Sequence, residues 1–444
     1  MKRLAFLSPL PPAPTGIADY SVEVATLLAG HYAIDLFSDE MDVDLSRIPA
    51  GCAVHAASTL LARHRERPYD LALYQMGNAP AHAFLYDLLP RVPGLMVLHD
   101  LVLHHSRARA FLDSESARAY VAEPWSATRR QAAEADVARY RAELAYCYPK
   151  QAERLVPVHL ETTGALLPYA YPLFQLPVEA TRLIAVHNGF MRDAVQSEVP
   201  DARVVRIPHQ APVVSIASDT VAALRTRHGL SADDFVVGVF GLLTREKRVE
   251  TVARAVARAA RHFPRVKLLL VGAVPEGEPL ETLLVQLGVR DRTIVTGRVA
   301  WEELPAYMTL PDVAVQLRYP TARETSGALL RLLAQGRPTV ISDLAHQSEI
   351  PDGAVVRADV TDEEGEVTRA IERLAASPAK RERLGQNARA FIEREHAPAR
   401  TCAAYVDAIE EAMRLPDPPQ RAWPAHWPQQ RGGTHTRTGG QHGR

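Results

Sequence analysis

The chain has 444 residues, and its 51 basic and 52 acidic side chains leave a formal net charge of −1, which disfavours a nucleic-acid partner because such binding normally needs a strongly positive surface. Its cysteines, Cys52, Cys147 and Cys402, lie far apart without metal-ligand spacing, so we expect neither a disulfide framework nor a structural zinc, as in a reducing compartment. The N-terminus shows no signal-peptide cleavage site, and no apolar run reaches the roughly 18 residues of a membrane span, so we expect a soluble, cytoplasmic protein.

The first half of the chain alternates short apolar strands with amphipathic helices. We expect a helix from Ala18 to about Ala29, and strands at 3–8, 33–38, 71–75, 95–100 and 182–187. This alternation predicts a doubly wound parallel sheet. The segment 106–155 is instead rich in Ala, Arg and Glu, which predicts a pair of solvated helices inserted into this first domain.

The same pattern restarts after residue 215. Val249, Val252, Val256 and Phe263 share one helical face, further helices are expected from Leu280 and at 301–308, and strands at 235–240, 266–272, 293–297, 312–317 and 338–342. The sequence therefore predicts the α/β class, with two Rossmann-like domains that face each other across a cleft.

The domain boundaries follow from this repeat. We place an N-terminal domain at 1–212 and a C-terminal domain at 213–395, with the hinge near 208–218. A helix at 396–414 is expected to cross back to the first domain. The tail, 415–444, is rich in Pro, Gly, Gln, His and Arg and is expected to be disordered, because it cannot build a core.

Loops at the carboxyl ends of parallel strands are where such sheets bind ligands. In "SPLPPAPTGIADYS", Gly16 precedes a helix whose free N–H groups could face an anion, although an ordinary turn explains it equally well. In "FGLLTREKRVE", Gly241 is followed by Arg245, Lys247 and Arg248 at a helix start. Cations at the start of a helix are repelled by the positive end of the helix dipole, and an anionic ligand would offset this repulsion. A solvated basic turn is the alternative.

A third loop, "RYPTARETSGALL", places Glu324 before Thr325, Ser326 and Gly327. The N–H groups of this turn suit a phosphate, and the Glu324 carboxylate could accept hydrogen bonds from hydroxyls, which together suggest a sugar phosphate. A plain N-cap is the alternative.

Several motifs occur in the order of a known family. "FGLLTREKRVETVARAV", "LLLVGAV", "VTGRVAWEELPAYM", "DVAVQLRYPTARETSGALLRLLAQGRPTVISD" and "SEIPDG" resemble the donor half of the retaining glycosyltransferases of family four (glycosyl transferases group 1), which have the GT-B fold. "SPLPPAPTGIADYS", "YQMGN", "VLHDLVLHH" and "AVHNGF" resemble the acceptor half, so that the resemblance spans about 3–412.

The resemblance implies roles for individual residues. Glu324 matches an acid near the transferred sugar and His99 a histidine near the reacting sugar, so these two are the candidate catalytic residues. Lys247 matches the lysine on the donor diphosphate. Arg298 and Val299 match the segment beside the nucleobase. The remaining donor-binding candidates are Gly16, Gly241, Arg245, Thr325, Ser326, Gly327 and Ala328.

The sequence departs from the family pattern at two positions. Leu242 stands where the family has an arginine, so Lys247 would need help from Arg245 or Arg248. The second acid, which usually holds the nucleotide ribose, is replaced by Leu332 or, on an alternative alignment, by Arg331. The sequence therefore does not show what binds the ribose.

The implied activity is transfer of a sugar from a nucleotide-sugar donor to a glycan, a lipid-linked sugar or a small molecule, with retention and without a metal, as in polysaccharide biosynthesis at the inner membrane face. His99, Asp100, His104 and His105 lack the spacing of a zinc site. A non-catalytic nucleotide-sugar-binding protein, or an epimerase or phosphorylase of GT-B type, remains the alternative. Acceptor choice is assigned to the first domain and its insertion.

Overall fold

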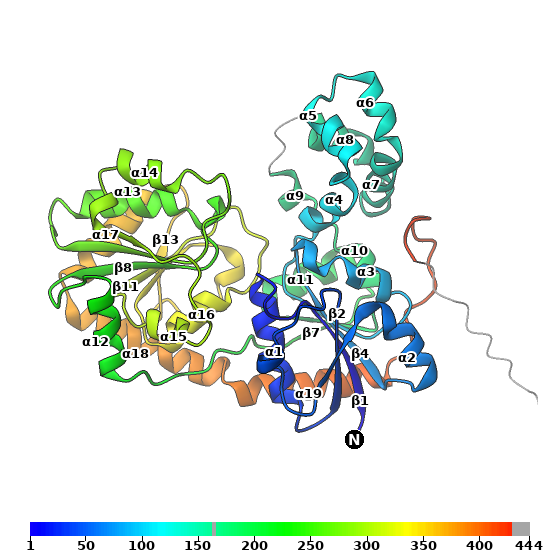
Figure 1. Ribbon diagram of the computed structural model, residues 1–444, viewed down its shortest axis with the longest axis horizontal. Coiled ribbons are helices and arrows are strands. Elements are labelled where there is room, and N and C mark those ends of the chain that lie inside the picture. The colour runs from blue at the N-terminus through cyan, green and yellow to red at the C-terminus, as the bar shows by residue number, and fades with distance from the viewer. Residues whose placement is uncertain (162–165, 429–444) are drawn as a thin grey trace, which may run out of the picture.

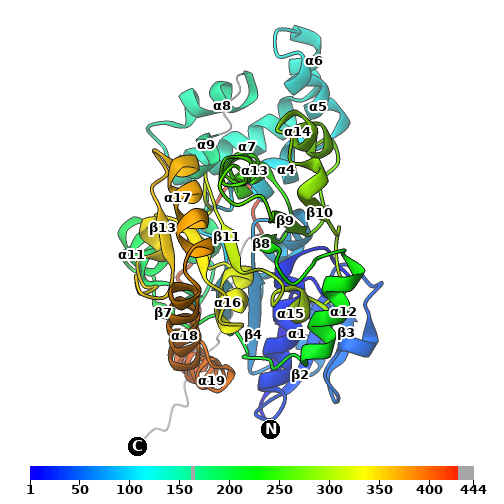
Figure 2. The same ribbon diagram turned by 90° about the vertical axis from the view of Figure 1, so that its left-hand side faces the viewer.

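The structure is a computed structural model that describes residues 1–161 and 166–428. Two α/β domains lie next to each other, and a cluster of helices projects from one of them (Figure 1). Each domain contains one parallel sheet with helices on both faces (Figure 2). The prediction of two Rossmann-like, doubly wound domains is therefore confirmed.

The N-terminal sheet has seven strands in the described residues, in the order β3-β2-β1-β4-β5-β6-β7, and every pairing is parallel. The central strands are apolar along their whole length because helices cover both faces. The strands are β1 (Arg3–Leu7), β2 (Ala33–Ser38), β3 (Ala53–Ala56), β4 (Leu71–Met76), β5 (Leu95–Leu98), β6 (Leu183–Val186) and β7 (Val204–Arg206).

Helices of this domain form two layers. α1 and the C-terminal helix α19 (Pro398–Arg414) cover one face of the sheet, and α2, α3, α10 and α11 cover the other. The helices are α1 (Gly16–Leu28), α2 (Leu60–Glu66), α3 (Phe84–Leu88), α9 (Leu167–Ala170), α10 (Gln175–Glu179) and α11 (Gly189–Glu198), with short 3₁₀ turns η1 (Leu45–Arg47), η2 (Ala57–Thr59) and η3 (Pro80–His82).

The helical insertion is larger than the sequence indicated. We predicted a pair of solvated helices at 106–155, whereas the structure has α4 (His104–Leu112), α5 (Glu115–Ala122), α6 (Ala127–Ala132), α7 (Glu134–Cys147) and α8 (Ala152–Glu161). These helices surround an apolar core of their own that includes Tyr140 and Leu144, both fully buried. The many surface charges concealed this core, because the short helices each bury only a narrow stripe.

The C-terminal sheet has six strands in the described residues, in the order β10-β9-β8-β11-β12-β13, again all parallel. Its strands are β8 (Phe235–Phe240), β9 (Val266–Val271), β10 (Thr293–Val295), β11 (Val313–Gln316), β12 (Thr339–Ser342) and β13 (Val356–Ala358).

In this domain α13 and α17 cover one face of the sheet, and α12, α15 and α16 cover the other (Figures 1 and 2). Val249, Val252 and Val256 are buried on α13 as predicted, whereas Phe263 lies beyond its end. The helices are α12 (Ser218–Arg227), α13 (Val249–Ala259), α14 (Leu280–Gln286), α15 (Leu304–Tyr307), α16 (Gly327–Ala334), α17 (Glu363–Ala375), α18 (Pro378–Glu395) and α19 (Pro398–Arg414), with 3₁₀ turns η4 (Arg245–Lys247), η5 (Arg290–Arg292) and η6 (Ala345–Gln347).

The chain returns to the N-terminal domain through α19, which packs against α1. The hydroxyl groups of Tyr405 and Tyr20 lie 3.0 Å apart in the buried contact, and Lys2 forms an ion pair of 2.6 Å with Glu410. No helix in the described part of the chain is both long and apolar enough to cross a membrane.

The segment after α19 corrects the predicted tail. Trp423 and Trp427 are 6% and 2% exposed, and both belong to the core on the α3 side of the N-terminal sheet. His426 lies 3.2 Å from Glu143, which pairs with the buried Arg107 of α4. The prediction of disorder is therefore wrong for 415–428, because two large aromatic side chains supply the apolar area that the polar residues lack. Residues 429–444 lie outside the described part.

Candidate active site

Lys247 is the central cation of the candidate site. It ends η4, which a short loop separates from β8, and its side chain is buried with the ammonium 3.4 Å from the terminal amide of Gln316. Burial, together with the nearby Arg318 guanidinium, lowers the pKa of Lys247 to about 7. Gly241 has φ +104°, and a side chain at this position would meet the Lys247 ammonium. The glycine thus permits both the turn and the inward course of the lysine.

The second cation is Arg318, which sequence reasoning missed. We expected Arg245 or Arg248 to assist Lys247, but Arg245 is exposed and pairs with Glu278 at 3.1 Å. Arg248 begins α13 and pairs with Glu363 at 2.8 Å. Both guanidinium groups are therefore engaged by other carboxylates and do not pair with Glu324. The only signal for Arg318 is its position two residues after β11, at the carboxyl edge where such sheets bind ligands.

Glu324 faces these cations. Its carboxylate forms an ion pair with Arg318 at 2.8 Å and accepts a hydrogen bond from the Thr321 hydroxyl at 3.1 Å. Burial disfavours the charged form, but the cations, Arg318 foremost, outweigh it and hold the pKa of Glu324 below its usual value. Lys247, Gln316, Arg318, Glu324, Ser326 and His346 line one small pocket. The structure thus brings together the two most important donor-side predictions.

The turn from Thr325 to Ala328 forms the start of α16. Ser326 is its N-cap, and its hydroxyl accepts a hydrogen bond of 3.3 Å from the Leu329 N–H. Thr325 is held from the other domain, because the Asn188 amide donates to its hydroxyl at 3.1 Å and to the Arg323 carbonyl at 3.2 Å. The N–H groups at this end of α16 can bind an anion.

Gly327 and Ala328 complete this end of α16. A side chain at Gly327 would contact the His209 ring at 3.3 Å, so the helix approaches the interdomain linker closely. Ala328 is partly buried against the core between the sheet and α15. These two residues therefore fix the position of the helix N-terminus, and Ala328 offers no polar side chain to a ligand.

His99 does not present a free ring nitrogen to the site. Its Nε2 lies 2.7 Å from the Gln75 amide oxygen and its Nδ1 lies 3.1 Å from His187 Nε2. Burial, with His187 and His209 nearby, holds its pKa well below the usual range. The expected direct role of His99 at the reacting sugar does not fit these contacts, because the ring is 6% exposed with both nitrogens engaged.

Asp100, the next residue, lies closer to the donor-side groups. It follows β5 and accepts a hydrogen bond of 2.9 Å from the Asn78 N–H. Burial and the Glu324 carboxylate raise its pKa. Two neighbouring carboxyl groups are therefore driven to different protonation states, with Glu324 ionised and Asp100 the more readily protonated.

Three further predicted residues lie at the periphery. Gly16 begins α1, where it is exposed, and Arg298 is also exposed. Val299 is partly buried against the core. No hydrogen bond between described residues joins them to Lys247 or Glu324, so the structure does not bring them into the charged pocket itself.

The structure shows what Leu332 and Arg331, the two residues that replace the second acid, contact instead. Leu332 is fully buried in the core, whereas Arg331 reaches the other domain and binds both carboxylate oxygens of Glu23 at 2.8 and 2.7 Å. The Arg331 guanidinium also stacks on Trp301, 4.6 Å from the ring centroid. Glu23 accepts a third hydrogen bond, of 2.9 Å, from Gln210 in the linker. This position therefore joins the two domains.

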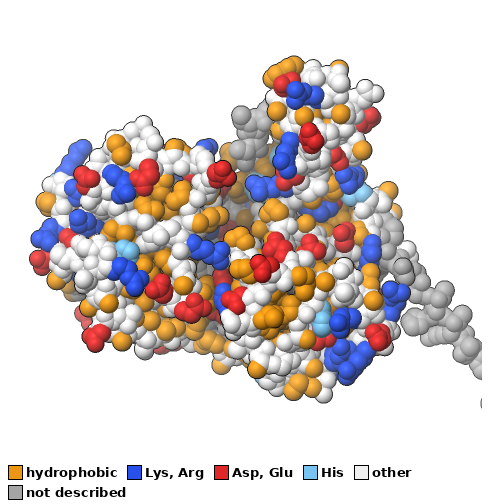
Figure 3. Space-filling model, in the orientation of Figure 1, with side chains coloured by type: hydrophobic (Ala, Val, Ile, Leu, Met, Phe, Trp, Pro, Cys, Tyr) orange, Lys and Arg blue, Asp and Glu red, His pale blue; other side chains and the backbone are white. Residues whose placement is uncertain are grey.

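Other contacts close the same interface. The Leu101 N–H donates to the Ala322 carbonyl at 2.9 Å, and the Gly189 N–H donates to Glu349 at 2.9 Å. The surface is hollowed between the C-terminal domain and the insertion, with basic side chains beside the hollow (Figure 3). Together, the contacts place a buried lysine, an arginine–glutamate pair and a helix N-terminus against the other domain. Such a site can bind a diphosphate and adjacent hydroxyl groups.

Comparison with known proteins agrees with this geometry. Residues 221–391 match the family model described as Glycosyl transferases group 1. The alpha-D-kanosaminyltransferase of Streptomyces kanamyceticus is 30% identical over 198 residues, which are 44% of this chain and 50% of that protein. The MMP alpha-(1->4)-mannosyltransferase of Mycolicibacterium hassiacum is 29% identical over 209 residues, 46% of this chain and 49% of that protein. The chain thus matches about half the length of these curated relatives.

Solved structures show the same fold over most of the chain. Anabaena HepE in complex with UDP and glucose has a TM-score of 0.63 at 17% identity, covering 93% of this chain and 100% of that one. The sucrose-phosphate synthase of Thermosynechococcus elongatus has a TM-score of 0.65 at 18% identity, covering 93% and 99%. The GT-B fold is confirmed, and the family match supports a group 1 glycosyltransferase.

Proposed function

We propose that the chain is a glycosyltransferase that moves a sugar from a nucleotide-sugar donor to an acceptor hydroxyl. The observation that carries this proposal is the convergence of Lys247, Arg318 and the N-terminus of α16 around Glu324. The two cations and the free N–H groups suit the donor diphosphate, and the ionised Glu324 suits the hydroxyls of the adjacent sugar. The relatives named as mannosyl- and kanosaminyltransferases favour a hexose or an aminohexose as the transferred group.

The chemistry requires negative charge on the leaving diphosphate to be stabilised as the bond to the sugar breaks. Lys247 and Arg318 supply this stabilisation from fixed, desolvated positions, where an electrostatic contact is worth more than in water. We propose retention of the anomeric configuration and catalysis by these cations without a metal, as the family resemblance implies. Contact between the domains would exclude water, which otherwise hydrolyses the donor.

A second candidate is a binding protein of the same fold that does not catalyse transfer. Two observations favour it: α16 carries no acid at position 331 or 332, and both ring nitrogens of His99 are engaged by Gln75 and His187. This candidate predicts binding of a nucleotide sugar without either transfer or hydrolysis.

The experiment begins with thermal denaturation of the full chain in a panel of UDP-, GDP-, ADP- and TDP-sugars. A bound donor at about 100 times its dissociation constant should add roughly 2.7 kcal/mol to the free energy of unfolding. Lys247→Ala should abolish this stabilisation, and the matched Lys380→Ala, at an exposed lysine of the same domain, should retain it.

Release of nucleotide is then measured with and without a mixture of hydroxyl acceptors. Nucleotide release with a glycosylated product supports the transferase, and binding without either reaction supports the binding protein. Absence of stabilisation by every donor in the wild-type chain would contradict both candidates.

A further inference from the structure

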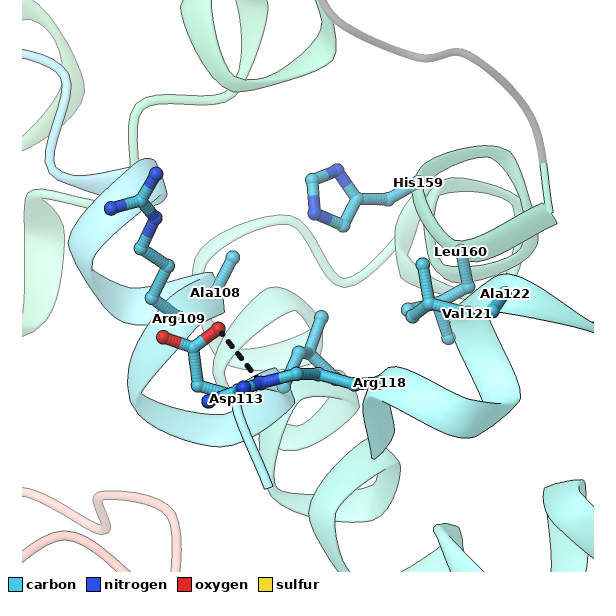
Figure 4. Close-up of a pocket in the computed structure, with 9 residues that line it drawn as sticks. Ala108, Arg109, Asp113, Arg118, Val121, Ala122, His159 and Leu160 are labelled. Carbon is cyan, nitrogen blue, oxygen red and sulfur yellow. Dashed lines mark ion pairs between the residues drawn. The ribbon is translucent and has the colours of Figure 1, made fainter. Parts of the chain in front are cut away.

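The helical insertion contains a cavity of about 350 Å³, away from the charged pocket. It lies between α4, α5 and α8, and its walls include Ala108 and Leu112 from α4, Val121 and Ala122 from α5, and Leu160 from α8. Figure 4 shows Ala108, Val121, Ala122 and Leu160 beside one open space. We propose that this cavity binds the non-reacting part of the acceptor, an apolar group that carries an anionic substituent; this inference rests on the proposed function.

The walls and the rim of the cavity differ in chemistry. The walls are mostly aliphatic, while Arg109 and His159 stand on opposite sides of the opening (Figure 4). Arg109 is exposed, and no ion pair with another described residue engages its guanidinium. The other basic residue, Arg118, is only 3.8 Å from Asp113. One cation at the rim thus remains available, which complements an anionic group next to an apolar one.

His159 adds an aromatic ring to the inner wall. Its ring packs against those of His104 and Tyr140, with centroids 5.3 and 5.4 Å away, and its buried Nδ1 has no hydrogen-bond partner among the described residues. Because this atom has almost no accessible surface, it does not face the open space, and His159 contributes its ring to the cavity wall.

The cavity is connected to the candidate active site by α4. At the beginning of this helix, His105 packs edge-on against Tyr169 with ring centroids 5.1 Å apart, and Arg323 of the donor-side loop donates to the Tyr169 carbonyl at 3.5 Å. Arg109 follows His105 by one helical turn, about 6 Å along the axis. The cavity thus adjoins the second half of α4, and the donor-side loop adjoins the beginning of the same helix.

The size of the cavity selects the class of occupant. Pockets of roughly 300–1,000 Å³ hold drug-sized molecules, whereas a protein partner needs a broad surface. A volume of about 350 Å³ fits one or two fused rings or a short branched alkyl group. The occupant is accordingly a small amphiphilic acceptor, with its reacting hydroxyl group directed along α4 to the interface and its anionic group beside Arg109.

The binding test uses a probe with the proposed chemistry, 1-anilinonaphthalene-8-sulfonate, which joins aromatic rings to a sulfonate. Its fluorescence titration on the wild-type chain should show one saturable site. Ala122→Trp, which places an indole in the cavity from an exposed helix position, and Arg109→Glu should each weaken binding at least tenfold. The matched control Arg91→Glu, at an exposed arginine outside the insertion, should leave the affinity unchanged.

A second control removes another surface on which the dye might bind. Trp125 is 79% exposed and follows the cavity residue Ala122 by three positions in the sequence. Trp125→Ala should not change the fluorescence titration. Binding that persists in Ala122→Trp and Arg109→Glu, or that disappears only in Trp125→Ala, would overturn the site. Circular dichroism and thermal denaturation of each variant verify that the insertion is folded.

The functional test uses every acceptor that the wild-type chain glycosylates. Ala122→Trp should lower kcat/KM for the acceptor at least tenfold, while donor affinity and donor hydrolysis in the absence of acceptor remain unchanged. Equal kcat/KM values in wild type and variant would overturn the acceptor role. A wild-type chain that neither binds donors nor transfers would contradict the proposed function and hence the acceptor identity, whereas selective loss of dye binding would still establish the cavity as a ligand site.

Discussion

The two domains present chemically different groups at their facing edges, although both are parallel sheets with helices on each face. The C-terminal edge gathers charges: Lys247, Arg318 and Glu324 lie around one small pocket. The N-terminal domain and the linker instead pack neutral rings, in which His99, His187 and the linker residue His209 surround Tyr20 with ring centroids 4.5–5.5 Å away.

This difference teaches that the fold determines where a ligand binds, while the loop residues determine which half holds the charge. Burial lowers the pKa values of the three histidines, so this cluster stays uncharged at neutral pH and offers no positive charge to a phosphate. We call the C-terminal domain the charged half, and the N-terminal domain with the linker the packed half. We expect substitutions in the charged half to lower the rate of transfer, and substitutions in the packed half to lower the free energy of unfolding.

The largest expected effect lies in the packed half. Trp427→Ala removes a side chain that is 2% exposed and lies edge-on against Tyr86, with ring centroids 5.7 Å apart. It should lower the free energy of unfolding by about 3–5 kcal/mol, since large cavities in a core cost that much. Chemical denaturation measures this loss.

The matched control is Trp125→Ala, at a tryptophan that is 79% exposed, and it should change stability by less than about 0.5 kcal/mol. A chain that ends at Pro428 keeps both docked tryptophans, whereas one that ends at Pro416 loses them. Equal stability of these two truncated chains would mean that the segment does not dock.

Glu324→Gln should have the next largest effect, in the charged half. The change keeps the size of the side chain but removes the charge that pairs with Arg318 at 2.8 Å. If the carboxylate contacts the reacting sugar, transfer should fall on the order of a hundredfold, about 2.7 kcal/mol, while the free nucleotide still binds.

A purely structural role for Glu324, which precedes the Ser326 N-cap and is favoured by the dipole of α16, predicts a different outcome. Turnover would then stay near normal and stability would fall by about 1 kcal/mol or less. Transfer rates and melting temperatures from one preparation distinguish the two roles, with Glu302→Gln, at an exposed acid of the same domain, as the control.

The sequence predicted the charged half better than the packed half. Strand-to-helix alternation and loop position predict that Lys247 and Glu324 lie close together, because the carboxyl ends of parallel strands meet at one edge, and the structure places both in one pocket. Arg318 and Asp100 were missed, although each also follows a strand, since a lone charged residue after a strand is common. Their importance comes from contacts across the sheet and between the domains, which sequence order does not reveal.

The packed half was predicted less well because its stability depends on pairings between distant segments. The 106–155 insertion looked solvated, since its apolar residues converge only when its helices assemble around Tyr140. Composition also concealed the docking of Trp423 and Trp427, because two aromatic residues hardly alter the average of a polar tail. For the same reason, His99 matched a family motif while its ring is engaged by Gln75 and His187.

A smaller effect is expected where the two halves meet. Glu23→Arg and Arg331→Glu should each place like charges across a partly buried contact, and raise KM for the donor roughly tenfold, about 1.4 kcal/mol. The double variant restores opposite charges and should recover most of the loss, which a double-mutant cycle measures. Reversal of the exposed pair Arg258–Glu364 should leave KM unchanged. Losses that simply add in the double variant would contradict a direct interdomain pair.

The smallest expected effect is a pH dependence of nucleotide binding. Burial lowers the pKa of Lys247 to about 7, so the free protein loses the ammonium between pH 7 and 8. The affinity for a UDP- or GDP-sugar, whose diphosphate does not titrate near neutral pH, should therefore be nearly constant below pH 6 and fall by up to about fivefold from pH 7 to 8, because the anion needs the protonated lysine.

Lys247→Arg keeps a cation throughout this range and should flatten the profile, whereas Asp100→Asn tests whether the neighbouring carboxyl contributes instead. As the pH rises, the effect of Lys247 on the stability of the fold has the opposite sign to its effect on nucleotide affinity. Between pH 7 and 10.5 the unfolded chain binds more protons than the folded one at this lysine, so its contribution to the free energy of unfolding rises with pH. Calorimetric titrations from pH 6 to 8.5 measure the affinities. A profile that is identical in wild type and Lys247→Arg would show that Lys247 does not supply the titrating charge at the diphosphate.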